Sequence, residues 1–152
     1  NHSAPSIAVH AGGDFDNVRN WSALKWRSLL ETIIEKTSYH ILLIAGDGES
    51  RHIDRLSANL PSNRLTMLRN LSFAELAPQI ARCQAFIGHD SGISYLATAT
   101  GIPSILLWGP TNRTIWQPLG QNATVLWNRY GATGISQDQI LAALPMVWSG
   151  AE

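Results

Sequence analysis

The chain has 152 residues, enough for one domain with a hydrophobic core of its own, and 45% of them are apolar. Lysine plus arginine number 11, as do aspartate plus glutamate. The composition therefore shows neither a basic field for nucleic acid nor an acidic run typical of disorder. Cys83 is the only cysteine, which excludes an internal disulfide and favours a reducing compartment.

Apolar runs alternate along the chain with segments in which apolar residues recur every three or four positions. The runs predict strands and the periodic segments predict helices. The predicted strands span 7–11, 41–45, 65–68, 85–88, 104–108 and 123–127. The predicted helices span 22–36, 50–59, 72–82, 91–100 and 136–144, where 22, 72 and 136 are capping serines.

Several residues mark where the helices begin and end. Ser72-Phe-Ala-Glu75 and Ser136-Gln-Asp-Gln139 both have the spacing of a capping box, in which the serine and the third residue after it exchange hydrogen bonds. Gly101 stands where the end of a helix favours a left-handed residue, and Pro103 prevents the helix from continuing.

The alternation of strands and helices predicts an α/β fold with a mostly parallel sheet covered on both faces. The continuous apolar run 41–45 is typical of a strand buried on both sides. Because crossovers between parallel strands are right-handed, the expected layout is a doubly wound, Rossmann-like sheet.

Gly88-His-Asp-Ser-Gly92 lies at the joint between a predicted strand and a helix. Ligands of such sheets bind beyond the carboxyl ends of the strands. Ser91 and Gly92 can offer the free N–H groups of the helix start to a phosphate, and glycine allows close approach. Asp90 would repel a phosphate but can accept hydrogen bonds from sugar hydroxyls. The segment thus fits a nucleotide-sugar, while a simple helix cap explains the same residues and is commoner.

Three more predicted strands end in glycine-containing segments, which are Gly12-Gly13, Gly46–Glu49 and Gly109–Thr111. Asp47 and Glu49 can accept from ribose hydroxyls, although either one alone also fits a solvated turn. Arg19 follows the first strand and can pair with a pyrophosphate, or it is an ordinary surface charge. Because these segments all follow the carboxyl ends of predicted strands, they are expected to line one common crevice, although glycine is also an ordinary turn residue.

Several familiar motifs are absent. No G-x-G-x-x-G follows the first strand, and the chain has neither a P-loop nor a G-x-S-x-G elbow. The histidines show no metal-ligand spacing with Cys83, so no metal is expected. His10 and His89 remain of interest because both lie at the ends of predicted strands.

The chain resembles the C-terminal domain of glycosyltransferase family nine, the ADP-heptose:lipopolysaccharide heptosyltransferases. The resemblance covers nearly the whole chain in the right order, and the Asp-Ser-Gly block together with the Gly-Pro-Thr loop is fairly specific. The matching segments are Val18–Trp21, Phe86–Ala97, Gly101–Thr111 and Trp116–Gly120.

The resemblance implies a GT-B enzyme, in which two Rossmann-like domains face each other. The C-terminal domain binds the activated sugar donor. The N-terminal domain binds the lipid-linked acceptor and supplies the catalytic aspartate. Residues 1–152 would then be a single donor-binding domain, a piece of a longer protein that lacks the acceptor domain and contains no catalytic residue of its own.

The same resemblance suggests roles for individual residues. Asp90 would contact the donor sugar, and Ser91 and Gly92 would contact the phosphates. Arg19 stands where the family usually has a phosphate-binding lysine, and Tyr95 where it usually has a histidine near the phosphates. A phenol donates a hydrogen bond but carries no positive charge near neutral pH.

The expected function is binding of an ADP-heptose-like donor for an inverting transfer in lipopolysaccharide core or related glycan synthesis. It requires no cofactor and no nucleic acid, and the full protein is expected in the cytoplasm with at most peripheral membrane contact. Met67, Leu68 and Leu71 line a base pocket or belong to the core. The alternative is a non-catalytic α/β module for protein contacts or plain nucleotide binding.

Overall fold

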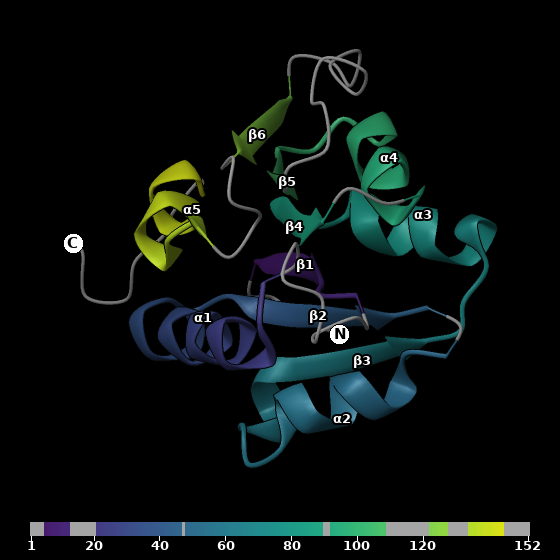
Figure 1. Cartoon of the computed structure of the whole chain (residues 1–152). Helices are drawn as coiled ribbons and strands as arrows, with labels where there is room; N and C mark the ends of the chain where they lie inside the picture. The colour runs from purple at the N-terminus through teal and green to yellow at the C-terminus, as the bar shows by residue number, and fades with distance from the viewer. Residues whose placement is uncertain are drawn as a thin grey trace.

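The computed structural model describes residues 5–12, 21–46, 48–89, 92–108, 122–127 and 134–144. These residues form one six-stranded sheet in the order β3-β2-β1-β4-β5-β6, with helices on both faces (Figure 1). Every described strand pair is parallel, which confirms the predicted doubly wound α/β layout. The strands are β1 Ser6–His10, β2 His40–Ala45, β3 Leu65–Arg69, β4 Ala85–His89, β5 Ser104–Trp108 and β6 Ala123–Trp127.

The helices follow the predicted order and differ from the prediction at a few ends. They are α1 Ala23–Lys36, α2 Ser50–Ser57, α3 Phe73–Ala81, α4 Gly92–Ala99 and α5 Gln137–Ala143, together with a 3₁₀ turn, η1 Ser62–Arg64, that the sequence did not predict. Helix α2 stops two residues before the predicted Asn59. Asn59 has a φ of 65°, a left-handed conformation that ends a helix.

The predicted helix caps are present. Ser22 accepts a hydrogen bond from the backbone N–H of Lys25, and both Ser72 and Ser136 form complete capping boxes. Gly101 has a φ of +91°, the left-handed conformation that was expected after α4. Because local sequence sets these ends, the helices begin and end close to the predicted positions.

Two hydrophobic cores lie on opposite faces of the sheet. Strand β1 shows the alternation, because Ile7 and Val9 point into one core and Ala8 into the other. The first core contains residues of α1, α2 and α5, and the second contains residues of α3 and α4. The central strands are therefore buried on both sides, as the apolar run in β2 predicted.

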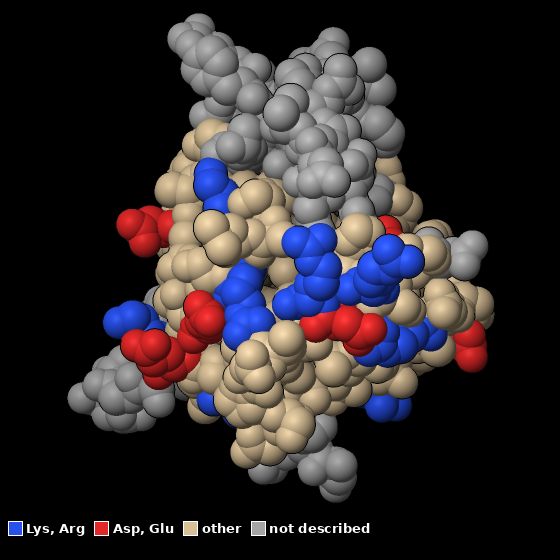
Figure 2. All heavy atoms as spheres, turned by 60° about the horizontal axis from the view of Figure 1, so that its bottom comes forward, with Lys and Arg blue, Asp and Glu red and all other residues tan. Residues whose placement is uncertain are grey.

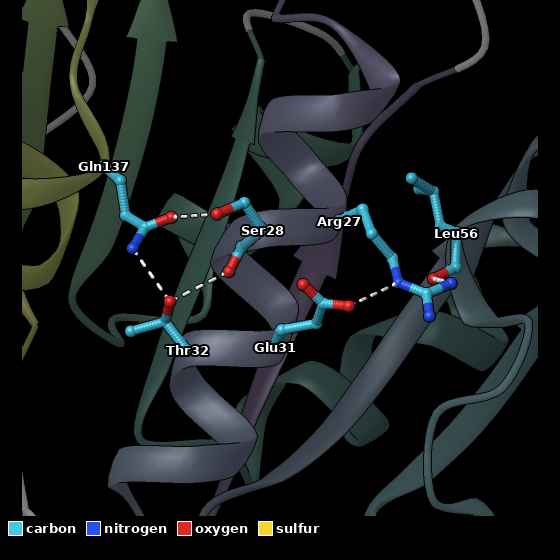
Figure 3. Close-up of polar contacts among 6 residues, drawn as sticks. All are labelled: Arg27, Ser28, Glu31, Thr32, Leu56 and Gln137. Carbon is cyan, nitrogen blue, oxygen red and sulfur yellow. Dashed lines mark hydrogen bonds and ion pairs between the residues drawn. The ribbon is translucent and has the colours of Figure 1, made fainter.

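Helix α5 is fastened to α1 by hydrogen bonds between side chains (Figure 3). Gln137 accepts from the Ser28 hydroxyl at 3.0 Å and donates to the Thr32 hydroxyl at 2.8 Å. On the other side of α1, Arg27 pairs with Glu31 at 3.2 Å and donates to a backbone carbonyl of α2. The last helix is thus tied to the first, far away in sequence.

The surface around α2 carries charges of both signs. Figure 2 shows lysine and arginine side chains lying close to aspartate and glutamate on this side of the molecule. Arg69 and Asp54 form an ion pair of 2.6 Å there. In the part of the chain that the structure describes, no helix is long and apolar enough to cross a membrane.

Candidate functional site

The order of the strands marks one position at the carboxyl edge of the sheet. Strands β1 and β4 are neighbours, yet β1 leads into α1 on one face and β4 into α4 on the other. In doubly wound folds ligands bind outside the strand ends at this reversal. His10 ends β1 and His89 ends β4, so both histidines lie at the expected position.

The side chain of Glu49 contacts His10 at the end of β1. The Oε1 atom of Glu49 lies 2.9 Å from His10 Nε2 and accepts a hydrogen bond of 2.6 Å from the backbone N–H of Gly46. His10 is buried and the Glu49 side chain is partly exposed. The loop between β2 and α2 is therefore held against the neighbouring strand.

This environment favours the ionised form of Glu49. The hydrogen bond from His10 lowers the pKa of the carboxyl group most, burial opposes it, and the charge of His10 and the N–H of Gly46 lower the pKa further. Glu49 was predicted as an acceptor for ribose hydroxyls, and an ionised carboxylate is the acceptor that this role requires.

His89 is buried, as His10 is. Burial is the main reason that its pKa falls to about 4, and the charge of nearby His10 adds to the effect, while a backbone hydrogen bond with Leu107 acts the other way. Its ring packs edge-on against Trp26, with 5.5 Å between ring centroids. His89 is therefore a neutral side chain at neutral pH.

Gly92 begins α4, as expected within one residue, and an aromatic side chain lies close to it. A Cβ atom at Gly92 would lie 3.1 Å from the ring of Phe73, the first residue of α3, which is half exposed. The missing side chain thus leaves room for an aromatic ring, and the predicted contact of Gly92 with a phosphate stays a prediction. Tyr95 follows on the next turn of α4 and is partly exposed.

Gly12 has a φ of +74°, and nothing lies within 4 Å of the position of a Cβ atom. Backbone conformation therefore explains this glycine, as for any turn that needs the left-handed region. The other predicted site residues lie outside the described residues, and their placement stays a prediction. They are Gly13, Arg19, Asp47, Asp90, Ser91 and Thr111.

The hydrophobic residues suggested for a base pocket are divided between core and surface. Leu68 and Leu71 are partly buried and pack against the core between the sheet and α3 and α4. Met67 is 37% exposed, on the opposite side of β3 from Leu68. A core role is thus established for the two leucines, and Met67 remains a surface candidate.

Sequence reasoning missed two contacts of this region. The pairing of His10 with Glu49 joins residues 39 positions apart, and the packing of Phe73 on Gly92 joins two helices. The position of His10 at a strand end was the only signal for the first contact. Nothing in the residue pattern distinguished Phe73 from a core residue of α3.

Three further observations on the described residues concern places away from the carboxyl edge or chemistry other than donor binding. A cavity of about 310 Å³ is lined by residues of the first two turns of α1, the start of α5 and the segments before them, including Trp21, Lys25 and Gln137. None of the described site residues lines it. Among the residues placed by the structure, no group of histidine, cysteine, aspartate and glutamate is arranged to hold a metal ion. Burial raises the pKa of the Cys83 thiol to about 12, so this cysteine is not a nucleophile.

Comparison with known proteins places the chain among glycosyltransferases. The model of the family described as glycosyltransferase family 9 (heptosyltransferase) matches residues 2–141. Lipooligosaccharide heptosyltransferase 2 of Haemophilus influenzae is 27% identical over 126 residues, which are 80% of this chain and 36% of that protein. The chain therefore spans little more than a third of the length of this relative.

Solved structures show the same fold. The E. coli heptosyltransferase WaaC with ADP superposes with a TM-score of 0.80 at 21% identity, covering 93% of this chain and 44% of the other. The same enzyme with ADP-2-deoxy-2-fluoro heptose gives a TM-score of 0.77 at 22% identity, with 93% and 43% covered. The doubly wound parallel sheet defines a protein of the α/β class. With the family match over most of its length, the chain belongs to glycosyltransferase family 9.

Proposed function

We propose that this chain is the donor-binding domain of a heptosyltransferase-like enzyme that takes part in lipopolysaccharide core or related surface glycan synthesis. The observation that carries the proposal is the family match over residues 2–141. Two structural neighbours were determined with ADP and with an ADP-heptose analogue, which supports an ADP-sugar as the ligand class. The full protein would act in the cytoplasm, with a lipid-linked acceptor bound by a second domain.

The proposed reaction inverts the anomeric carbon of the donor sugar. A base in the acceptor domain takes the proton of an acceptor hydroxyl, whose oxygen attacks the anomeric carbon. The bond from that carbon to the phosphate oxygen breaks, and ADP leaves with the electron pair. The part of this chain is to hold the donor and to stabilise the negative charge that develops on the diphosphate.

The proposed contacts divide the donor into sugar, phosphates and ribose. Asp90 accepts from the sugar hydroxyls, and Arg19 pairs with the diphosphate. Glu49 accepts from the ribose, a role supported by its place at the carboxyl edge and by the contact with His10 that holds its carboxylate there. Further contacts to the phosphates and the nearby loops are assigned to Gly12, Gly13, Asp47, Ser91, Gly92, Tyr95 and Thr111. No metal ion is needed, because helix N–H groups and Arg19 supply the positive charge.

Calorimetric titration of the chain with ADP, UDP, GDP and an ADP-sugar tests the proposal. We expect ADP to bind, and Arg19→Ala to weaken ADP and ADP-sugar alike. Asp90→Ala should lower the affinity for ADP-sugar about tenfold or more and leave ADP unchanged, because one charge-assisted contact contributes about 1.5–3 kcal/mol. Asp138→Ala removes an exposed acid from the first turn of α5 and serves as the matched control.

Two results would contradict this assignment. If none of the nucleotides binds, the chain is the non-catalytic module that the sequence left as the alternative. If Asp90→Ala lowers the melting temperature without changing the affinity ratio of ADP-sugar to ADP, Asp90 is a helix cap and does not contact the sugar.

A further inference from the structure

Glu49 occupies a capping position but its side chain does not cap the helix. It is the N-cap residue of α2, and its side chain makes no hydrogen bond to the first turn of that helix. The side chain instead reaches His10 on β1 and the N–H of Gly46. The side chains that ordinarily accept from the N–H groups of their own helix at this position are the shorter ones of Ser, Thr, Asp and Asn. The longer side chain of Glu49 reaches across to the neighbouring strand.

The surroundings of the carboxylate are shaped to hold this orientation. A Cβ atom at Gly46 would lie 3.2 Å from Glu49 Oε1, closer than ordinary contact, so a glycine leaves the space that the oxygen occupies. His10 is 4% exposed, and the side chain of Glu49 is 23% exposed. One end of the pair is fixed in the interior, and the other end reaches the surface.

Both described hydrogen bonds of the carboxylate end on the same oxygen. His10 Nε2 and the N–H of Gly46 both meet Oε1, so among the described residues Oε2 is left for a ligand. Because a carboxylate only accepts, His10 carries its proton on Nε2 in this contact. His10 thus orients Glu49 without occupying both of its oxygens.

We propose that His10 is a positioning residue that holds the Glu49 carboxylate so that Oε2 accepts hydrogen bonds from the vicinal hydroxyls of a nucleotide ribose. The inference rests on the proposed function, because it assigns a partner to one contact of the donor site. It differs from a purely structural role, in which the pair would only fix the β2–α2 loop to β1.

The affinity ratio of ADP to 2′,3′-dideoxy-ADP measures this contact directly. The two ligands differ only in the ribose hydroxyls, so a carboxylate that holds them should favour ADP about tenfold or more in the unaltered chain. Glu49→Ala should bring the ratio close to one. His10→Leu, which has no donor atom, should lower the ratio severalfold while the affinity for dideoxy-ADP stays within about twofold.

A conservative variant separates positioning from general stability. His10→Gln keeps an N–H donor at a similar reach to Nε2 and should restore most of the ratio that His10→Leu loses. The matched control is His40→Leu, since His40 is also buried, also bonds through Nε2, to Thr66 at 2.7 Å, and lies at the opposite end of its strand. It should lower the melting temperature and leave the ratio unchanged.

Each outcome bears on a different claim. Absence of ADP binding by the unaltered chain overturns the proposed function and this inference with it. ADP binding with a ratio near one, or a ratio that survives His10→Leu, overturns this inference alone. If His10→Leu does not fold, Gly46→Ala decides the question, because its Cβ atom displaces Oε1 and should lower the ratio in the same way.

Discussion

The two edges of the parallel sheet use polar side chains in opposite ways. At the amino edge, Arg64 donates to the backbone carbonyls of Ile34, Thr37 and Tyr39, and Asn122 donates to those of Thr98 and Ile102. At the carboxyl edge, the Glu49 carboxylate accepts from the His10 side chain as well as from the backbone N–H of Gly46, and two groups there have shifted pKa values. Arg64 and Asn122 thus satisfy backbone carbonyls, whereas Glu49 at the carboxyl edge keeps one oxygen to which no described residue bonds.

The contrast has a physical origin. Chain segments that enter a buried strand leave carbonyl groups without partners, and an arginine fork or an amide can satisfy several of them at once. Such residues contribute to stability, and few of their hydrogen-bond donors remain for a ligand. Shifted pKa values, by contrast, are commonest at functional sites. The carboxyl edge is therefore where we expect variants to change binding more than folding.

The largest expected effect lies at the amino edge. Arg64→Ala removes hydrogen bonds to three carbonyls at once and should lower the free energy of unfolding by roughly 3–4 kcal/mol, measured by urea denaturation. The affinity for ADP should not change in the fraction that remains folded. If Arg64→Ala lowered the affinity for ADP without lowering stability, the proposed difference between the two edges would be wrong.

The second effect concerns acid and the carboxyl edge. The folded-state pKa of His89 is about 4, below the ordinary 6.5, so between these pH values the unfolded chain binds a proton that the folded chain does not. Stability is therefore complete above pH 6.5 and falls as the pH drops toward 4. At 1.36 kcal/mol for each pKa unit, the loss is about 3 kcal/mol.

Urea denaturation at a series of pH values checks this expectation, with His89→Gln as the comparison. The variant should lose the slope between pH 6.5 and 4. Glu49 acts in a more acidic window, because its lowered pKa contributes stability above the ordinary value of 4.5 that is lost as the pH falls through the folded-state value. An equal slope in both proteins would show that His89 is hydrated and that the carboxyl edge is less dry than the structure indicates.

Local and periodic signals predicted most of the fold. The strands, the capping boxes and the turn at Gly101 depend on residues close together in sequence, and the structure contains all of them. The roles of Arg64 and Asn122 were not predicted, because their acceptor carbonyls are brought near only by the sheet. The pairing of His10 with Glu49 was not predicted either, because only the folded sheet brings these two residues together.

The candidate site shows the same division between local and distant information. The sequence located the carboxyl edge and identified Gly12, Glu49 and Gly92 as residues beyond the ends of strands, which the structure places there. The sequence could not predict which side chain lies beside each glycine, because these neighbours come from other helices and strands. Phe73 at Gly92 and the carboxylate at Gly46 are such cases.

The smallest expected effect compares two glycines around the end of β4. A Cβ atom at Gly88 would lie 2.7 Å from ring atoms of the fully buried Phe86 and 3.3 Å from the backbone oxygen of His10, neither of which can move freely. Gly88→Ala should therefore cost about 2 kcal/mol by overpacking. At Gly92 the neighbour is the half-exposed ring of Phe73, which can turn toward solvent.

Gly92→Ala should therefore change the free energy of unfolding by no more than about 0.5 kcal/mol, as surface substitutions usually do. The measurement is urea denaturation of both variants beside the unaltered chain. If Gly92→Ala costs as much as Gly88→Ala, the ring of Phe73 is held in place as firmly as the core, and the first turn of α4 is rigid before any ligand binds. If Gly92→Ala instead leaves the free energy of unfolding nearly unchanged and lowers the melting temperature that is measured with saturating ADP, the added methyl group interferes with ADP binding. Gly92 would then behave in the way predicted for the carboxyl edge, because its substitution alters binding and leaves the fold intact.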